Sequence, residues 1–139
     1  MRTLTTGLWT GVLMNALGWV GNAFLLRQEW REAIAAGAGA TRTRTGLNEI
    51  VSLIPDFVYG LALAWLYAHL RATLGPTLGT AIKAALAVWA IGALTTYLGV
   101  ANAGLLPVRI SVLTSLLALV LFVPAAWLVH RLSERRLVP

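Results

Sequence analysis

Four long, almost wholly apolar stretches dominate this chain, and each is long enough to cross a lipid bilayer. A helix needs about 20 mostly apolar residues, at about 1.5 Å rise per residue, to cross a hydrocarbon core about 30 Å thick. The stretches that meet this length are Leu8–Leu26, Ile50–Leu70, Leu78–Ala101 and Val108–Val129. Since a backbone in lipid must satisfy its own hydrogen bonds, each stretch is expected to be a helix. The sequence therefore predicts an all-α fold: a four-helix transmembrane bundle formed by a single domain, residues 1–139.

The composition agrees with lipid as the solvent. Of the 139 residues, 58% are hydrophobic and 12% are charged, whereas soluble domains carry about 45–50% apolar and about 25% charged residues. The net charge of +6 comes from scattered arginines and one lysine beside apolar runs, which is typical of contact with anionic lipid headgroups. A nucleic-acid-binding protein would gather its positive charge on a folded polar domain. The expected partner is thus the lipid bilayer and not a nucleic acid.

The first apolar stretch is the weakest of the four. It is interrupted by Asn15, Gly18, Gly21 and Asn22. With Arg2 ahead of it, a cleaved signal peptide is the alternative interpretation. We expect a retained span instead, because the apolar run is long for a signal peptide and ends in the charged segment Arg27-Gln28-Glu29. The residues that follow, about 28–36, are predicted to form an interfacial helix anchored by Trp30.

Basic residues indicate the orientation in the membrane. Four spans put both termini on one side, here called the terminal side, and leave an opposite side. The terminal side carries Arg2, Arg71, Lys83, Arg131, Arg135 and Arg136, and the opposite side carries Arg27, Arg31, Arg42, Arg44 and Arg109. Positively charged residues accumulate on the cytoplasmic side. This distribution predicts a multi-pass protein of the inner (plasma) membrane with both termini in the cytoplasm.

Short segments of the chain resemble one another. Gly21-Asn22-Ala23 near the end of the first stretch is similar to Ala101-Asn102-Ala103 at the end of the third, and Ala64-Trp65-Leu66 in the second is similar to Ala126-Trp127-Leu128 in the fourth. A duplicated helical hairpin would give this pattern, with a pseudo-twofold axis along the membrane normal. Coincidence in a chain rich in alanine and leucine is the alternative.

Small residues at every fourth position predict close helix packing. The spacing occurs in Gly7-x-x-x-Gly11, in Gly60-x-x-x-Ala64-x-x-x-Ala68 and in Ala81-x-x-x-Ala85. Such positions let two backbones approach closely in a membrane, but they do not say which helices meet. In the first stretch, the amide of Asn15 is expected to bond a neighbouring helix.

Asp56 is the most informative single residue. It lies inside the second apolar stretch, and an aspartate near the middle of a span costs about 2.5–3.5 kcal/mol on insertion scales. Such residues face the inside of the bundle and have a partner or a task. Pro55, beside it, removes a backbone donor and predicts a kink or a late helix start. The helical spacing of three and four places Glu49, Ser52 and Tyr59 on the same face as Asp56.

The other stretches bring polar residues to the same half of the bundle. These residues are Asn22, Tyr97, Asn102 and Arg109. We therefore predict a polar vestibule that opens to the opposite side, with Asp56 paired to Arg109, flanked by Asn22 and Asn102, and completed by Glu49, Tyr59 and Tyr97. A purely structural clamp between helices is the alternative, and Arg109 can also reach the headgroups without pairing with Asp56.

Two histidines close spans on the terminal side. His69 and His130 each follow a tryptophan by about one turn, so they could clamp a haem axially. Each also stands beside an arginine, and the order Trp-His-Arg is typical of an interfacial anchor. We expect the anchor, and therefore no cofactor. There are no cysteines and no catalytic or metal-binding motifs such as HExxH, a P-loop or GxSxG, so no metal site and no catalytic residues are predicted. A membrane enzyme that uses scattered residues is the alternative to a protein without catalytic activity, and the second is favoured.

The first span and its end resemble a family. Leu17-Gly18-Trp19, followed by Leu25-Leu26-Arg27-Gln28-Glu29-Trp30, is similar to an uncharacterised group of short bacterial four-span membrane proteins, in which a tryptophan-rich first helix ends in a basic–x–Trp stretch. The Trp-Tyr-x-Pro of that group is replaced here by Trp19-Val20-Gly21-Asn22. The resemblance implies architecture only, because that group has no assigned activity.

Two functions from different classes follow from these patterns. The expected function is that of a small accessory or structural subunit, which packs as a homo-oligomer or in a larger membrane complex. Its six tryptophans and several small-residue faces leave surface for such contacts. The alternative is small-molecule or ion binding, or transport, through the vestibule around Asp56.

Overall fold

The computed structural model describes residues 2–38 and 46–134, with the backbone alone for 46–49. All of the regular secondary structure in these residues is helical, so the predicted all-α class is confirmed. In chain order the elements are α1 (Arg2–Val20), the π-helical segment η1 (Gly21–Leu25), α2 (Arg27–Ala35), α3 (Gly46–Leu74), α4 (Leu78–Val88), the π-helical segment η2 (Trp89–Leu94), α5 (Thr95–Asn102) and α6 (Val108–Glu134).

Three helical stretches in the described residues are long and apolar enough to cross a membrane. They are Ile50–Leu74, Leu78–Asn102 (which joins α4, η2 and α5) and Val108–Glu134. They confirm the second, third and fourth predicted stretches, and two of them run several residues further than predicted. The first predicted stretch is also helical, as α1 and η1, but it is not among the three. Its asparagines, glycines and threonines lower its apolar content.

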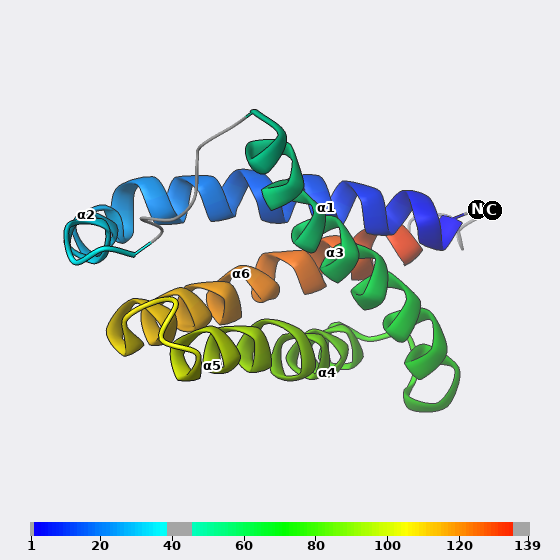
Figure 1. The fold of residues 1–139 in the computed structure, drawn as a ribbon. Coiled ribbons are helices and arrows are strands. Elements are labelled where there is room, and N and C mark those ends of the chain that lie inside the picture. The colour runs from blue at the N-terminus through cyan, green and yellow to red at the C-terminus, as the bar shows by residue number, and fades with distance from the viewer. Residues whose placement is uncertain (1, 39–45, 135–139) are drawn as a thin grey trace.

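The helices share two ends, which Figure 1 shows. α1, α6 and the α4–α5 rod run roughly alongside one another, and α3 crosses them obliquely. The first turn of α1, the last turn of α6 and the α3–α4 connection lie at one end, which corresponds to the terminal side. α2 and the α5–α6 connection lie at the other end. Pro55 lies inside α3, which begins at Gly46. Of the two predicted effects of this proline, the late start is therefore wrong, and the kink stays a prediction.

The apolar core lies between α3, α4 and α6. Its largest fully buried side chains include Leu63 and Tyr67 from α3 and Phe122 and Val129 from α6. α4 contributes a face of small residues, Thr80, Ala81, Ala84 and Ala85, all buried. Because these side chains are short, α4 can approach both neighbours closely. The predicted packing role of Ala81 and Ala85 is confirmed.

α1 and α3 cross backbone against backbone. A Cβ atom added at Gly60 would lie 2.5 Å from the Gly11 nitrogen and 2.5 Å from the Gly7 oxygen. A Cβ added at Gly7 would lie 2.7 Å from the Leu61 Cα. No side chain larger than hydrogen fits at this crossing. The Gly7-x-x-x-Gly11 pair of α1 therefore meets Gly60, the first small residue of the Gly60-x-x-x-Ala64 repeat in α3.

α2 is held against the start of α6. The Trp30 indole Nε1 donates a hydrogen bond of 2.8 Å to Asn22 Oδ1 in η1. Arg109, in the first turn of α6, lies 3.7 Å from a Glu29 carboxylate oxygen and 3.8 Å from one of Glu32. The helix predicted over 28–36 is confirmed within one residue at each end. These contacts join α2 to η1 and to the first turn of α6.

Candidate functional site

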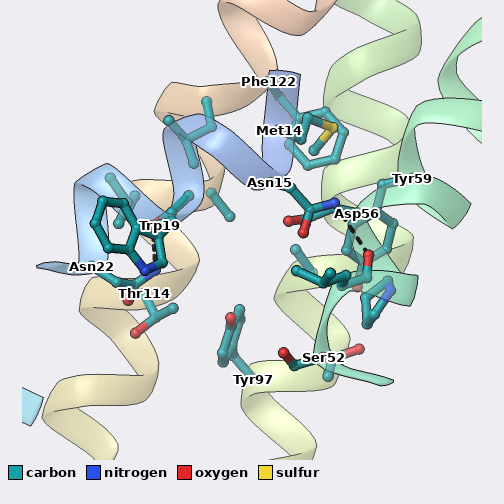
Figure 2. A pocket seen from close by; sticks show the side chains of 18 residues that line it. Met14, Asn15, Trp19, Asn22, Ser52, Asp56, Tyr59, Tyr97, Thr114 and Phe122 are labelled. Atoms are coloured by element: carbon teal, nitrogen blue, oxygen red, sulfur yellow. Dashed lines mark hydrogen bonds between the residues drawn. The ribbon is translucent and has the colours of Figure 1, made fainter. Parts of the chain in front are cut away.

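A cavity of about 400 Å³ lies between α1, α3, α5 and α6, on the α2 side of the glycine crossing. Side chains from all four helices line it, together with residues of η1 and η2. Its polar lining residues are Asn15, Asn22, Ser52, Asp56, Tyr59, Thr96, Tyr97 and Thr114. Figure 2 shows Asn15, Asp56 and Tyr59 together on one side, Trp19, Asn22 and Thr114 on the other, and Tyr97 between them.

The cavity has a buried floor and an exposed rim. Met14 and Phe122 form part of the floor and are 3% and 1% exposed. Trp19, Leu53 and Thr96 belong to the rim and are exposed. The space is therefore closed toward the middle of the bundle and open at its edge, where α1, α3 and α5 separate.

Asp56 faces inward, as predicted. Its side chain is half-buried on the cavity wall, and a Cβ added at Gly18 of α1 would lie 3.8 Å from Asp56 Oδ2. The carboxylate thus points across the α1–α3 interface. The absence of a side chain at Gly18 leaves room for it there.

Asn15 ties α1 to α3 beside this carboxylate. Its Nδ2 donates to the Gly11 carbonyl at 3.1 Å and to the Leu53 carbonyl at 3.2 Å. The second bond joins two helices, which confirms the predicted contact with a neighbouring helix. Both bonds use the amide nitrogen of Asn15, so this side chain holds α1 against α3 in the cavity wall next to Asp56.

The predicted ion pair between Asp56 and Arg109 is wrong. Arg109 lies at the start of α6 and faces Glu29 and Glu32 of α2, and it does not line the cavity. Within residues 2–38 and 50–134, Asp56 has no hydrogen bond and no ion pair. Because α2 folds back toward α6, its side chains Glu29 and Glu32 lie within reach of Arg109. These charged groups at the end of the bundle also stay partly exposed to solvent, so pairing there costs less desolvation than pairing with Asp56 inside the bundle.

The other predicted vestibule residues have different outcomes. Asn22 lines the cavity, and its Nδ2 donates to the Gly18 carbonyl at 2.9 Å. Asn102 is exposed at the end of α5 and lies outside the cavity, so its predicted place is wrong. The side chain of Glu49 lies outside the described residues. The two asparagines that suggested a duplicated hairpin thus stand in different surroundings.

Tyr59 and Tyr97 both line the cavity, as predicted. The Tyr59 ring packs against η2, where a Cβ added at Gly92 would lie 2.5 Å from Tyr59 Cε1. It also packs against Phe122, with ring centroids 6.0 Å apart and ring planes tilted by 55°. Because the ring is wedged between two helices, its orientation in the cavity wall is set by packing.

Both π-helical segments border the cavity. η1 contains Asn22, and η2 contains Ala93, which also lines the space. A π-helical turn inserts an extra residue into a helix and occurs often at functional sites. Here η2 shifts the helical register of the side chains that follow it in α5, and η1 forms the last turn of the first helical stretch. Sequence reasoning missed both segments, because hydrophobic periodicity gives no signal for one added residue.

A second polar cluster joins α3 and α6 near the terminal side. The Tyr67 hydroxyl lies 3.0 Å from His130 Nδ1 and donates to Glu134 Oε1 at 3.2 Å. Arg71 also donates to Glu134 Oε1, at 2.9 Å. Since the hydroxyl has one proton, it accepts from His130 when it donates to Glu134. The two pairs of residues four apart, Tyr67 with Arg71 and His130 with Glu134, were the signal in the sequence that could have revealed this cluster.

The two histidines stand in unlike surroundings. His69 is exposed, and its Nδ1 lies 2.8 Å from the Trp65 carbonyl oxygen. The centroids of the His69 and Trp65 rings are 4.3 Å apart. His130 has its Nδ1 in the cluster with Tyr67. The structure thus gives the two imidazoles separate partners and no common site. No group of three or more His, Asp or Glu side chains in the described part of the chain could hold a metal ion.

Comparison with known proteins identified no relative of this chain. The resemblance to a group of short bacterial four-span proteins stays a prediction. The chain matches no protein-family model, no curated protein and no solved structure.

Proposed function

We propose that this chain is a four-span integral membrane protein that binds a small solute or ion in the cavity around Asp56. The observation that carries the proposal is a cavity of about 400 Å³ whose wall holds a carboxylate without a cationic partner in the described residues. Ligand sites are concave, mostly apolar, and carry a few convergent polar groups. Within a membrane, an ionisable residue facing a cavity marks a binding or transport path.

The surface of α1 supports a fourth span. The outward side chains of α1 and η1 are large and apolar, and several are strongly exposed, among them Trp9 at 60% in α1 and Phe24 at 75% and Leu25 at 71% in η1. The polar residues Asn15 of α1 and Asn22 of η1 line the cavity. This division suits a helix with lipid on one side and a polar interior on the other. We propose the plasma membrane as its location, with cytoplasmic termini, from the distribution of basic residues.

The binding function is favoured over a structural clamp. In a clamp the polar side chains pair with one another and the space between helices is filled, because atoms that line an unfilled space lose dispersion contacts. Here Arg109 is paired elsewhere and the space stays open beside Asp56. A role as an accessory subunit has no comparable observation, since exposed apolar side chains serve lipid and a partner protein equally.

Thermal unfolding in detergent with a panel of solutes tests the proposal. The panel contains alkali and alkaline-earth ions, organic cations, organic anions and neutral polar solutes. The wild type is compared with Asp56→Asn and with Glu32→Gln, which removes an exposed carboxylate outside the cavity. We expect one class of solute to raise the unfolding temperature of the wild type and Glu32→Gln but not of Asp56→Asn. A panel without any shift that depends on Asp56 contradicts the proposal.

A further inference from the structure

We infer that the cavity takes a monovalent organic cation with an apolar body, which competes with a proton for Asp56. This inference rests on the proposed binding function and names the class of solute. Its basis is the combination of one carboxylate, aromatic walls and a volume suited to an organic molecule.

The carboxylate of Asp56 gives the cavity one negative charge, which a ligand with one positive charge would neutralise. Asp56 is the only charged residue that lines it in the described part of the chain. The nearest candidate on α6, Arg109, is held by Glu29 and Glu32. An ionised carboxylate away from bulk water needs a positive charge beside it or a proton on it. One site for one positive charge favours a monovalent ligand.

The donor set does not suit a hard metal ion. Mg²⁺ and Ca²⁺ take about six or more oxygen ligands at short range, usually from several carboxylates or carbonyls. The cavity offers a single carboxylate in the described residues. Its other side-chain oxygens are neutral amide and hydroxyl groups spread over α1, η1, α3, α5 and α6. At about 30 Å³ per water molecule, the space corresponds to about 13 waters, far more than a bare ion fills.

The walls suit an organic body. Tyr59, Tyr97, Phe122 and Trp19 all line the cavity, alongside Met14 and several leucines. Aromatic rings attract a cation over their faces, by about 0.5–2 kcal/mol each according to exposure. Figure 2 shows Tyr97 reaching into the space between the Asp56 side and the Trp19 side. A cation with an apolar body would pair with Asp56 and pack against these rings.

The proton competes for the same carboxylate. The other titratable residues that line the cavity in the described part of the chain are Tyr59 on α3 and Tyr97 on α5. α1, η1 and α6 contribute the neutral side chains Asn15, Asn22 and Thr114. Binding of one cation therefore releases one proton where Asp56 is protonated. By linkage, the apparent Kd then weakens about tenfold for each pH unit of acidification.

The experiment uses tetraphenylphosphonium and tetraphenylborate, which have nearly the same size and shape but opposite charge. Binding to the full chain in detergent is measured by calorimetry over a range of pH and in two buffers of different ionisation enthalpy, which reveals proton release. We expect tetraphenylphosphonium to bind at least tenfold more tightly than tetraphenylborate. Glu32→Gln should bind like the wild type, and Asp56→Asn at least tenfold more weakly and without dependence on pH.

Variants of Tyr97 test the wall independently of Asp56. Tyr97→Phe keeps the ring and should retain affinity, whereas Tyr97→Leu should weaken binding of tetraphenylphosphonium by about 2- to 30-fold. Equal affinity for the two probes in the wild type, or affinity that is constant with pH, overturns the inference even if Asp56→Asn does not fold. If a metal ion or a neutral solute binds through Asp56 and the organic cation does not, the inference fails while the proposed function stands.

Discussion

At the scale of single residues, the carboxyl group of Asp56 is expected to destabilise the empty bundle. An aspartate at the centre of a span costs about 2.5–3.5 kcal/mol, which is an upper bound for Asp56 because it lies nearer the start of the span Ile50–Leu74. No described residue offsets this cost with an ion pair. Asparagine keeps the shape, and its amide still costs about 1–3 kcal/mol if poorly bonded. We therefore expect Asp56→Asn to raise the free energy of unfolding by about 1 kcal/mol without solute, measured by denaturant unfolding in detergent.

Thr96→Val is the matched control for that change, since Thr96 lines the same cavity without charge. It should alter stability by less than Asp56→Asn does. A loss of stability in Asp56→Asn would show that the carboxylate holds the helices together, which is the clamp interpretation.

Tyr67 should contribute measurable stability through its hydroxyl group. Tyr67→Phe removes the bonds to His130 and Glu134 in a side chain that is 0% exposed. A net cost of about 0.5–1.5 kcal/mol is expected, because two partly buried partner groups lose the hydroxyl. Denaturant unfolding checks this value, with Tyr97→Phe as a control that lies outside the cluster. An unchanged free energy of unfolding in Tyr67→Phe would mean that water replaces the hydroxyl.

At the scale of helices, the α1–α3 crossing is the contact least tolerant of substitution. Gly60→Ala would place a Cβ 2.5 Å from two backbone atoms of α1, so the helices must separate. Overpacking of this kind costs about 1–3 kcal/mol. Gly99→Ala is the matched control, since nothing lies within 4 Å of its added Cβ, and it should be neutral or stabilise α5 by up to about 1 kcal/mol. Equal unfolding free energies for both variants would contradict the crossing.

The helices were predictable from the sequence, and most of their contacts were not. Length and apolar content determine where a helix lies in lipid, so the stretches beginning at Ile50, Leu78 and Val108 were found. The inward face of Asp56 followed from its cost in hydrocarbon. The pairing of Arg109 with Glu29 and Glu32 was missed, because it depends on the direction in which α2 folds back. The hydrophobic periodicity of the sequence does not predict that direction. Asn102 was misplaced for a related reason: position along a helix gives depth, whereas the rotation of α5 decides which way the side chain faces.

At the scale of the whole molecule, the number of spans can be read from four single cysteines, because the natural chain has none. Arg2→Cys and Ala72→Cys lie toward the terminal side, and Ala36→Cys and Ala103→Cys toward the opposite side. With four spans and cytoplasmic termini, a membrane-impermeant maleimide added to intact cells should label Ala36→Cys and Ala103→Cys only, whereas four spans in the opposite orientation would give Arg2→Cys and Ala72→Cys only. Labelling of Arg2→Cys and Ala36→Cys from one side would mean that α1 does not cross.

The glycine crossing has a mechanical consequence. It divides α3 into two arms, one bearing Asp56 on the cavity wall and one bearing Tyr67 in the cluster with Glu134. Only hydrogen atoms separate the backbones of α1 and α3 at Gly60. A tilt of α3 that kept this contact would pivot there and move the two parts of the helix in opposite directions. A wider cavity around Asp56 would then bring with it a change in the distance between Tyr67 and α6.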